Sequence, residues 1–367
     1  MTNESKAIVL VMYILIALGV VMTYSASAVY ASQVFGSPTY FLRRQLFCVV
    51  IGSFIFFMSS SINLDFLKRH SRLLMGVAIL LLAAVFLPVL GHSAGGARRW
   101  IRLPFITFQP VEYAKLAMCI YLADYLSRKR QPITSGSISA FFPPAVLLFF
   151  VFLLVIAQPD LGSCIFLFLL MGILFFLSGI RLRYILLAAL GIVGAVVVLI
   201  WRAPYRMSRI TAYLDPWKDP RGSGFQIIQS FLAFGLGGIK GVGLGKSTQK
   251  LFYLPQSHTD FIFSIIGEEL GLLGALAVVV LFAIFFFCGN RLAQRCHDPF
   301  LKLLAFALVV FITLQALINL LVTVGLIPTK GLPLPFISYG GTALMFHMTS
   351  VGILVAIDRQ ANRPSIR

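Results

Sequence analysis

The chain has 367 residues, of which 59% are hydrophobic and 11% are charged. This composition excludes a soluble globular domain and is typical of a polytopic membrane protein. The formal net charge of +18 could indicate nucleic-acid binding, but the Lys and Arg residues are not gathered on one soluble domain, so we expect no nucleic-acid partner.

Ten apolar runs are long enough to cross about 30 Å of hydrocarbon as helices. They predict an all-α polytopic fold, organised as one integral membrane domain over residues 1–367. The first run is too long for the core of a signal peptide, so we expect an uncleaved anchor. The runs lie near residues 7–31, 45–63, 72–90, 111–126, 139–157, 161–180, 184–201, 261–289, 302–327 and 341–357.

Lys and Arg residues in the short connections predict the orientation. With the N-terminus inside, fifteen of them fall on the inner side and six on the outer side. We therefore predict that both termini are cytoplasmic and that residues 202–260 form a large outer loop between the seventh and eighth helices. The five cysteines lie in apolar runs or in a cytoplasmic loop, so we predict no structural disulfide and no Cys/His metal site.

The outer loop 202–260 is itself basic, with eight Lys or Arg residues against three Asp residues. Such a surface indicates an anionic partner at the membrane face, although a solvated loop beside lipid headgroups explains the charge equally well. Its run Gly241–Ser247 looks like a phosphate-binding P-loop, but Lys240 stands where that pattern requires glycine. We therefore reject a nucleotide site.

Asp260 stands where the outer loop meets the eighth apolar run. As a first-turn acid it would cap a helix. As a carboxylate at a border between water and hydrocarbon it would be partly desolvated, and its pKa and basicity would rise. Glu268 and Glu269 follow about 80° and 180° further round a straight helix, so we expect them to have a structural role in hydrogen bonding between helices.

Polar residues at three other places are candidates for a site. Glu112 and Lys115 are three residues apart at a helix start, so Lys115 pairs either with Glu112 or with a ligand phosphate. Asp160 follows Gln158–Pro159 in a tight outer turn, where it either caps the sixth helix or reaches a cavity. The Pro/Gly-rich segment Lys330–Gly341 is expected to be irregular backbone that is buried in protein or lines a cavity.

These motifs and their order resemble the FtsW/RodA/SpoVE membrane glycosyltransferases, the SEDS proteins, along nearly the whole chain. The runs Asp215–Trp217 and Gly241–Pro255 resemble FtsW and SpoVE more than RodA. Gln256 stands where the family usually has Glu, so a mechanism that needs a second acid beside Asp260 is not favoured. The motifs are GARRWI at 96–101, FQPxExAKL at 108–116, QPDLG at 158–162, RxxRI at 206–210, DPW at 215–217, QxxQS at 226–230, GxGxGxSxQK at 241–250, HTDF at 258–261 and PTKGLPLPFISYGG at 328–341.

The resemblance implies a peptidoglycan polymerase that joins lipid II units at the outer face of the membrane, with Asp260 as its catalytic residue. An α-linked donor and a β-linked product imply inversion, with Asp260 as the base and with positive charge holding the leaving diphosphate. A divalent cation, Mg or Mn, could share that work, although no acidic cluster specifies a metal site. The candidate residues for binding diphosphate or sugar are Arg98, Arg99, Trp100, Glu112, Lys115, Asp160, Arg206, Arg209, Lys250, His258, Lys330 and Ser338.

The resemblance also implies partners and a place in the cell. The substrates would be lipid II and undecaprenyl-diphosphate-linked glycan, and the protein partners would be a class B penicillin-binding protein (an FtsI-like transpeptidase) and other division proteins. We expect the protein in the cytoplasmic (inner) membrane at the division septum. The alternative function is a lipid II flippase, and a third is a scaffold that recruits a transpeptidase. Motifs on the outer face, without a visible inverted repeat, favour the polymerase.

Overall fold

The computed structural model describes residues 1–94, 97–102, 107–129, 142–201, 204–250 and 257–362, although not every side chain within them. Each of the ten predicted runs contains a helix, and the eighth contains two. Five helices, α1, α2, α13, α14 and α15, are long and apolar enough to cross a membrane. The helices at the ten runs are α1 (Asn3–Phe35), α2 (Tyr40–Ser59), α4 (Ser71–Ala84), α5 (Pro110–Arg128), α7 (Phe142–Ala157), α8 (Leu161–Leu177), α9 (Leu182–Trp201), α12 (Ile262–Glu269), α13 (Gly271–Arg295), α14 (Pro299–Thr323) and α15 (Gly341–Ala361).

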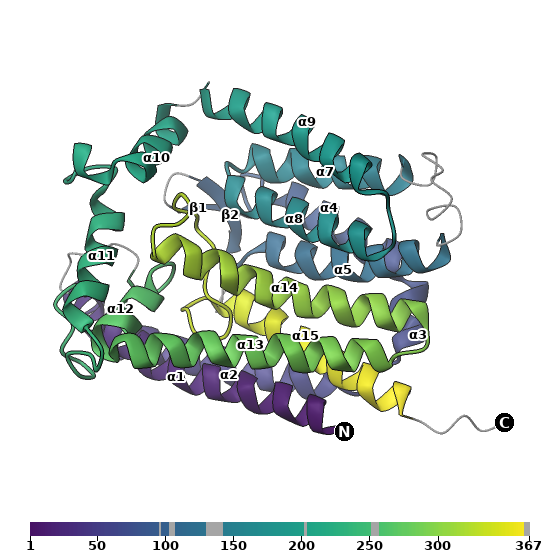
Figure 1. Cartoon of the computed structure of the whole chain (residues 1–367), viewed down its shortest axis with the longest axis horizontal. Helices are drawn as coiled ribbons and strands as arrows, with labels where there is room; N and C mark the ends of the chain where they lie inside the picture. The colour runs from purple at the N-terminus through teal and green to yellow at the C-terminus, as the bar shows by residue number, and fades with distance from the viewer. Residues whose placement is uncertain (95–96, 103–106, 130–141, 202–203, 251–256, 363–367) are drawn as a thin grey trace.

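Both termini lie at the same end of the helix bundle (Figure 1). The backbone N–H of Thr2 donates to Asp358 Oδ2 at 2.8 Å, and the Thr2 hydroxyl donates to Asp358 Oδ1 at 2.8 Å. Thr2 also caps α1 by accepting from the backbone N–H of Ser5, so the start of α1 is attached to the end of α15. A short helix at this end, α3 (Leu64–Arg69), connects α2 to α4.

α14 is the central helix of the bundle and packs against α5, α8, α13 and α15. Asp298 caps it through the backbone N–H groups of Phe300 and Leu301, and Pro299 occupies its first turn, where the missing N–H costs nothing. Helices at the edge instead leave large apolar side chains exposed, as Phe54 and Phe57 do on α2. Such exposure suits contact with lipid.

The eighth run is broken, which differs from the single long helix that the sequence predicts. α12 ends at Glu269 and α13 begins at Gly271, whose φ is +68°. A Cβ at Gly271 would lie 2.3 Å from the backbone nitrogen of Gly241, so the close approach of the two chains requires glycine. The backbone N–H groups of Val242 and Gly243 then bond the carbonyls of Glu268 and Glu269 at 3.0 Å.

The described part of the predicted outer loop 202–260 contains several helical segments. It contains α10 (Pro204–Leu214), the 3-10 turn η2 (Pro216–Lys218) and α11 (Phe225–Gly237). α11 is apolar and packs against α12, where the hydroxyls of Ser230 and Ser264 lie 2.6 Å apart. Along the described chain, this segment lies at the end of the bundle opposite the termini (Figure 1).

A small antiparallel sheet also lies at this end, and the all-α prediction did not include it. Its strands, in the order β1-β2-β3, are β1 (Gly91–Ala94), β2 (Ala97–Arg102) and β3 (Thr107–Phe108). His92 pairs with Trp100, and Ile101 pairs with Phe108. The sheet therefore presents the basic residues of β2 next to the start of α5.

The segment before α15 is irregular and buried, as the sequence predicts. Leu332, Leu334, Phe336 and Ile337 are each 2% exposed or less. Gly19 of α1 admits this backbone, because a Cβ there would lie 2.7 Å from the Cα of Ile337. The segment therefore reaches into the bundle between α1 and α14 while its ends stay near the sheet.

Candidate active site

Asp260 lies just before α12 and does not cap it. The cap position is Phe261, and no side chain accepts a hydrogen bond from the first turn. Among the described residues the Asp260 carboxylate forms no hydrogen bond and no ion pair, although it is only partly exposed. Burial raises the pKa of Asp260 to about 7, and the positive charges of Arg209 and Arg99 oppose that rise. The geometry thus removes the capping alternative and leaves a carboxylate suited to take a proton at neutral pH.

Arg99 faces Asp260 across Gly331. A Cβ at Gly331 would lie 3.5 Å from Asp260 Oδ2 and 4.0 Å from Arg99 Nη1. Because glycine has no side chain, a small gap remains between the Asp260 carboxylate and the Arg99 guanidinium, which form no ion pair with each other. A side chain at this position would fill the space in which a reacting group could sit.

Arg99 is fixed by the tight turn before α8. Its Nε donates to the carbonyl of Gln158 at 3.3 Å and its Nη2 donates to the carbonyl of Pro159 at 2.5 Å. Asp160 lies 4.0 Å from Arg99 Nη1 and also caps α8 through the backbone N–H of Ser163 at 3.0 Å. Asp160 therefore caps α8, as the first of its two alternatives has it, and its charge also acts on Asp260.

Lys330 and Arg209 complete the charged group. Arg209 on α10 donates to the carbonyl of Thr329 at 3.4 Å, which places it next to Lys330. Burial and the charge of Arg209 lower the pKa of Lys330 to about 8, while Asp160 raises it. Arg99 and Arg209, from separate parts of the chain, thus lie near the Asp260 carboxylate, and Lys330 lies near Arg209 and Asp160.

Ser338 and His258 are close to Asp260 in space or sequence but do not face the same gap. The Ser338 hydroxyl donates to the carbonyl of Thr259 at 2.6 Å and accepts from the backbone N–H of Leu334 at 2.8 Å. The backbone N–H of Tyr339 donates to the carbonyl of His258 at 3.0 Å. The His258 ring packs among aromatic rings, and burial lowers its pKa to about 4, so the ring is neutral at pH 7.

Glu112 and Lys115 form a buried pair with each other, which is the first of the two alternatives drawn from the sequence. Lys115 Nζ lies 2.7 Å from Glu112 Oε1, and their side chains are 0% and 1% exposed. The ammonium also donates to Gln315 Oε1 at 2.9 Å and lies 4.9 Å from the centre of the Phe166 ring. In this arrangement the pair attaches α5 to α14 and does not reach the gap beside Asp260.

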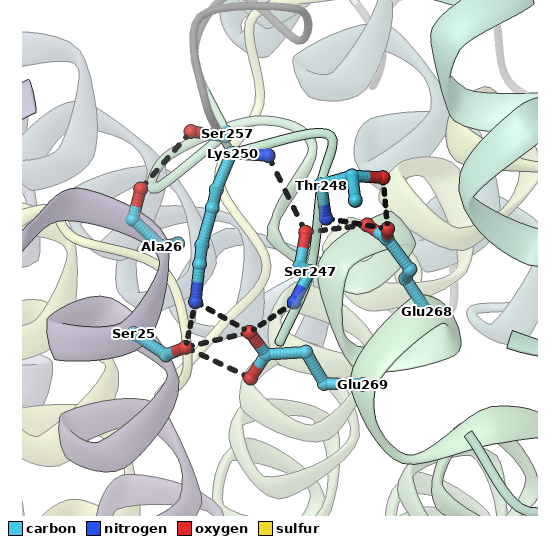
Figure 2. Close-up of polar contacts among 8 residues, drawn as sticks. All are labelled: Ser25, Ala26, Ser247, Thr248, Lys250, Ser257, Glu268 and Glu269. Atoms are coloured by element: carbon cyan, nitrogen blue, oxygen red, sulfur yellow. Dashed lines mark hydrogen bonds and ion pairs between the residues drawn. The ribbon is translucent and has the colours of Figure 1, made fainter. Parts of the chain in front are cut away.

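Lys250 is likewise paired within the protein (Figure 2). Its Nζ donates to Glu269 Oε1 at 3.0 Å and to Ser25 Oγ at 3.2 Å. Glu268 accepts from the hydroxyl of Ser247 and from the backbone N–H and hydroxyl of Thr248. The two glutamates therefore have the predicted structural role, but they hold the glycine-rich segment as well as α1.

Replacing Lys250 with Met tests whether this lysine is structural. The change leaves Glu269 buried with its bonds from Ser25 and Ser247, so we expect a loss of about 2 kcal/mol in stability from one bond between charged groups. Thermal unfolding in detergent measures it, and Lys246→Met, at an exposed position of the same segment, is the control. Unchanged stability together with lost lipid II binding would instead assign Lys250 to the substrate.

Three of the predicted binding residues, Arg98, Trp100 and Arg206, are not placed beside Asp260 by the described structure. Arg98 and Trp100 lie on β2 on either side of Arg99, where the register of the pairing with β1 shifts, and Arg98 is exposed. Arg206 lies on α10, but its side chain is outside the described part, as is all of Gln256. No three His, Cys, Asp or Glu side chains come together among the described residues.

The sequence analysis missed two amides on α14, Gln315 and Asn319. Both are buried, and Asn319 Nδ2 donates to the carbonyl of Asp260 at 2.8 Å. A signal was present, because two polar residues four positions apart inside a long apolar run lie on one helix face. Side-chain amides in a membrane helix need partners, and here those partners are the backbone of the site.

Comparisons with known proteins agree with this architecture. A sequence profile of the FtsW/RodA/SpoVE family, described as "Cell cycle protein", matches residues 5–363. A relative from Geobacter sulfurreducens, described as "Probable peptidoglycan glycosyltransferase FtsW", is 42% identical over 351 residues, covering 96% of this chain and 94% of the relative. "Stage V sporulation protein E" of Bacillus subtilis is 40% identical over 359 residues, covering 98% of each chain.

Two solved structures share the fold. One, from work described as "Structural coordination of polymerization and crosslinking by a peptidoglycan synthase complex", superposes with a TM-score of 0.80 at 28% identity, covering 97% of this chain and 98% of that one. The rod shape determining protein RodA of Thermus thermophilus superposes with a TM-score of 0.72 at 25% identity, with 97% of both chains covered. The chain is thus a multi-pass membrane protein that belongs to the FtsW/RodA/SpoVE family.

Proposed function

We propose that this protein is a peptidoglycan glycosyltransferase that polymerises lipid II into glycan strands at the outer face of the cytoplasmic membrane. The descriptions of relatives that match nearly the whole chain support this function. The observation that carries it is the Asp260 carboxylate, which has no hydrogen bond or ion pair to a described residue, faces Arg99 across Gly331 and lies near Arg209 and Asp160. A base and a cluster of cations are what glycosyl transfer from a lipid diphosphate needs.

In the proposed reaction, Asp260 takes the proton from the 4-hydroxyl of the GlcNAc of lipid II. The oxygen then bonds the anomeric carbon of the lipid-linked donor strand, and the bond from that carbon to the diphosphate oxygen breaks. The diphosphate leaves with the electron pair from the opposite face, which inverts the configuration. Arg99, Arg209 and Lys330 stabilise the charge that develops on it.

No three metal-binding side chains gather among the described residues, and of the two acids at this place Asp160 accepts from Ser163 and lies 4.0 Å from Arg99 Nη1. Asp260 and Asp160 could hold a divalent cation only together with the diphosphate of the substrate, as is common for Mg²⁺. We therefore derive no step through a metal. Assays with and without Mg or Mn would show whether one is required.

The orientation and the partners are also part of the proposal. The excess of Lys and Arg in the short inner loops supports cytoplasmic termini, which puts Asp260 at the outer side. The similarity to a chain from a peptidoglycan synthase complex supports a class B penicillin-binding protein as partner. We propose a division role at the septum, because relatives described as FtsW are among those that match.

The pKa values of Asp260 and Lys330 predict a bell-shaped pH dependence of kcat/KM. Below about pH 7 Asp260 becomes protonated and cannot act as a base, so the rate falls about tenfold per pH unit. Above about pH 8 Lys330 loses the charge that binds diphosphate. Lys330→Arg keeps its charge at high pH and should remove only the alkaline limb. A wild-type rate that does not fall below pH 7 would contradict Asp260 as the base.

The function is tested by lipid II polymerisation with the purified wild-type protein, alone and with a cognate transpeptidase. We expect glycan strands that a muramidase digests, which shows a β-linked product. The same protein in liposomes is tested for movement of labelled lipid II between the leaflets. Movement without strands under every condition would overturn the proposal in favour of a flippase.

A further inference from the structure

Asn319 connects the two segments that meet at the proposed base. It lies on α14, is 1% exposed, and donates from Nδ2 to the carbonyls of Asp260 and Leu332, both at 2.8 Å. Both partners are carbonyl oxygens, which only accept, so the amide must present its nitrogen to them. One side chain thereby ties the backbone of Asp260 to the backbone that leads to Lys330 and Gly331.

Gln315 extends this connection one turn earlier on the same helix face. Its Nε2 donates to the carbonyl of Pro333 at 3.0 Å, and its Oε1 accepts from the buried ammonium of Lys115. Residues four apart lie above one another on a helix. Gln315 and Asn319 therefore attach the consecutive carbonyls of Pro333 and Leu332 to the central helix of the bundle.

The Asp260 side chain depends on this attachment more than most catalytic groups would. Its carboxylate has no hydrogen bond to any described residue, so no side-chain contact fixes its direction toward Arg99. The carboxylate is therefore positioned by its backbone. Displacement of a reacting group by about 1 Å can cost about a hundredfold in rate.

We infer that Asn319 is a positioning residue of the proposed glycosyl transfer, which holds the Asp260 carboxylate in place relative to Arg209 and Arg99 without contacting the substrate. The inference rests on the proposed function. Asn319 Oδ1 is buried without a hydrogen-bond partner among the described residues. Only the nitrogen side of this amide therefore has a place in the network, and it binds the backbone at the site.

Asn319→Leu tests the inference, because leucine has a similar size and no donor. We expect kcat to fall about 30- to 100-fold while the KM for lipid II changes less than about threefold. The charged groups near Asp260, which are Arg209, Arg99 and Asp160, all remain in this variant. Loosened backbone admits water, so the acidic limb of kcat/KM moves below pH 7 toward the ordinary range of a carboxylic acid. A purely structural role would lower the folded fraction and leave that limb in place.

The control is Asn290→Leu. Asn290 is a partly exposed asparagine near the C-terminal end of α13, and in the described structure it accepts a hydrogen bond only from Gln294. It should leave kcat and the pH limb unchanged. If Asn319→Leu does not fold, Asn319→Ser is used instead, because serine retains one donor. It should give a smaller fall in kcat, and the acidic limb of kcat/KM should move in the same direction. A folded Asn319 variant with wild-type kcat and limb would overturn the inference. Absence of strands from the wild type would instead overturn the proposed function.

Discussion

Asp260→Asn is expected to abolish strand formation and to leave the fold intact. The amide has nearly the size of the carboxylate but cannot accept the proton of the attacking hydroxyl. The carboxylate has no hydrogen-bond partner among the described residues, so the change leaves no described donor without its acceptor. A general base contributes about 10² to 10⁴ to a rate, and we expect the loss to be about a thousandfold or more.

The measurement is the rate of lipid II consumption by matched amounts of wild-type and variant protein. Asp219→Asn is the control, since Asp219 is an exposed acid that accepts from Gly222 and Ser223 in the turn between η2 and α11. Its activity should equal that of the wild type. More than a tenth of the activity remaining in Asp260→Asn would rule out Asp260 as the base.

Lys115→Met is expected to destabilise the protein by about 3–5 kcal/mol, because it leaves the Glu112 carboxylate buried without its charge partner. Glu112 Oε2 already has no hydrogen-bond partner among the described residues, so no alternative donor is ready there. The expected result is a clear fall in the thermal unfolding midpoint in detergent. Adding Glu112→Gln to Lys115→Met removes the uncompensated charge and should recover most of the loss.

Lys240→Met is the matched control for this pair, since Lys240 is exposed on the outer side of the fold. It should leave the unfolding midpoint unchanged. A Lys115→Met protein as stable as the wild type would mean that the pair does not connect α5 to α14 as the contacts indicate. Recovery of the lost stability when Glu112→Gln is added to Lys115→Met would show that the loss comes from the unpaired charge and not from packing.

Local sequence patterns predicted much of this fold. Apolar length alone located a helix at each of the ten runs, and the spacing of Glu112 and Lys115 identified a pair that the structure contains. The sequence also predicted the irregular segment before α15, because its proline and glycine residues exclude a regular helix. These features depend on residues close together in the chain, which a sequence displays directly.

Features set by distant contacts could not be read in this way. The break between α12 and α13 occurs where Gly271 meets Gly241, thirty residues earlier in the chain. Lys250 looked like a ligand for diphosphate, but Glu269 and Ser25 take its ammonium after folding. Charge and spacing predict that a lysine needs a partner, and only the packing shows which partner it has.

The candidate active site has some features that the sequence predicted and others that only the structure shows. Asp260 was predicted from its place at the loop–helix border and from a family resemblance. The structure added that it does not cap α12 and that its carboxylate has no hydrogen bond to a described residue. Its nearness to Arg99, on the other side of Gly331, joins residues that are far apart in the sequence. Asn319 was overlooked because an amide in an apolar run reveals nothing about which backbone it will bind.

The most direct test of the central claim compares lipid II binding with turnover in Asp260→Asn. If Asp260 is the base, the dissociation constant for lipid II should stay within about threefold of the wild type while strand formation is lost. A loss of binding in proportion to the loss of turnover would make Asp260 a binding residue. Strand formation at the wild-type rate would contradict the account altogether.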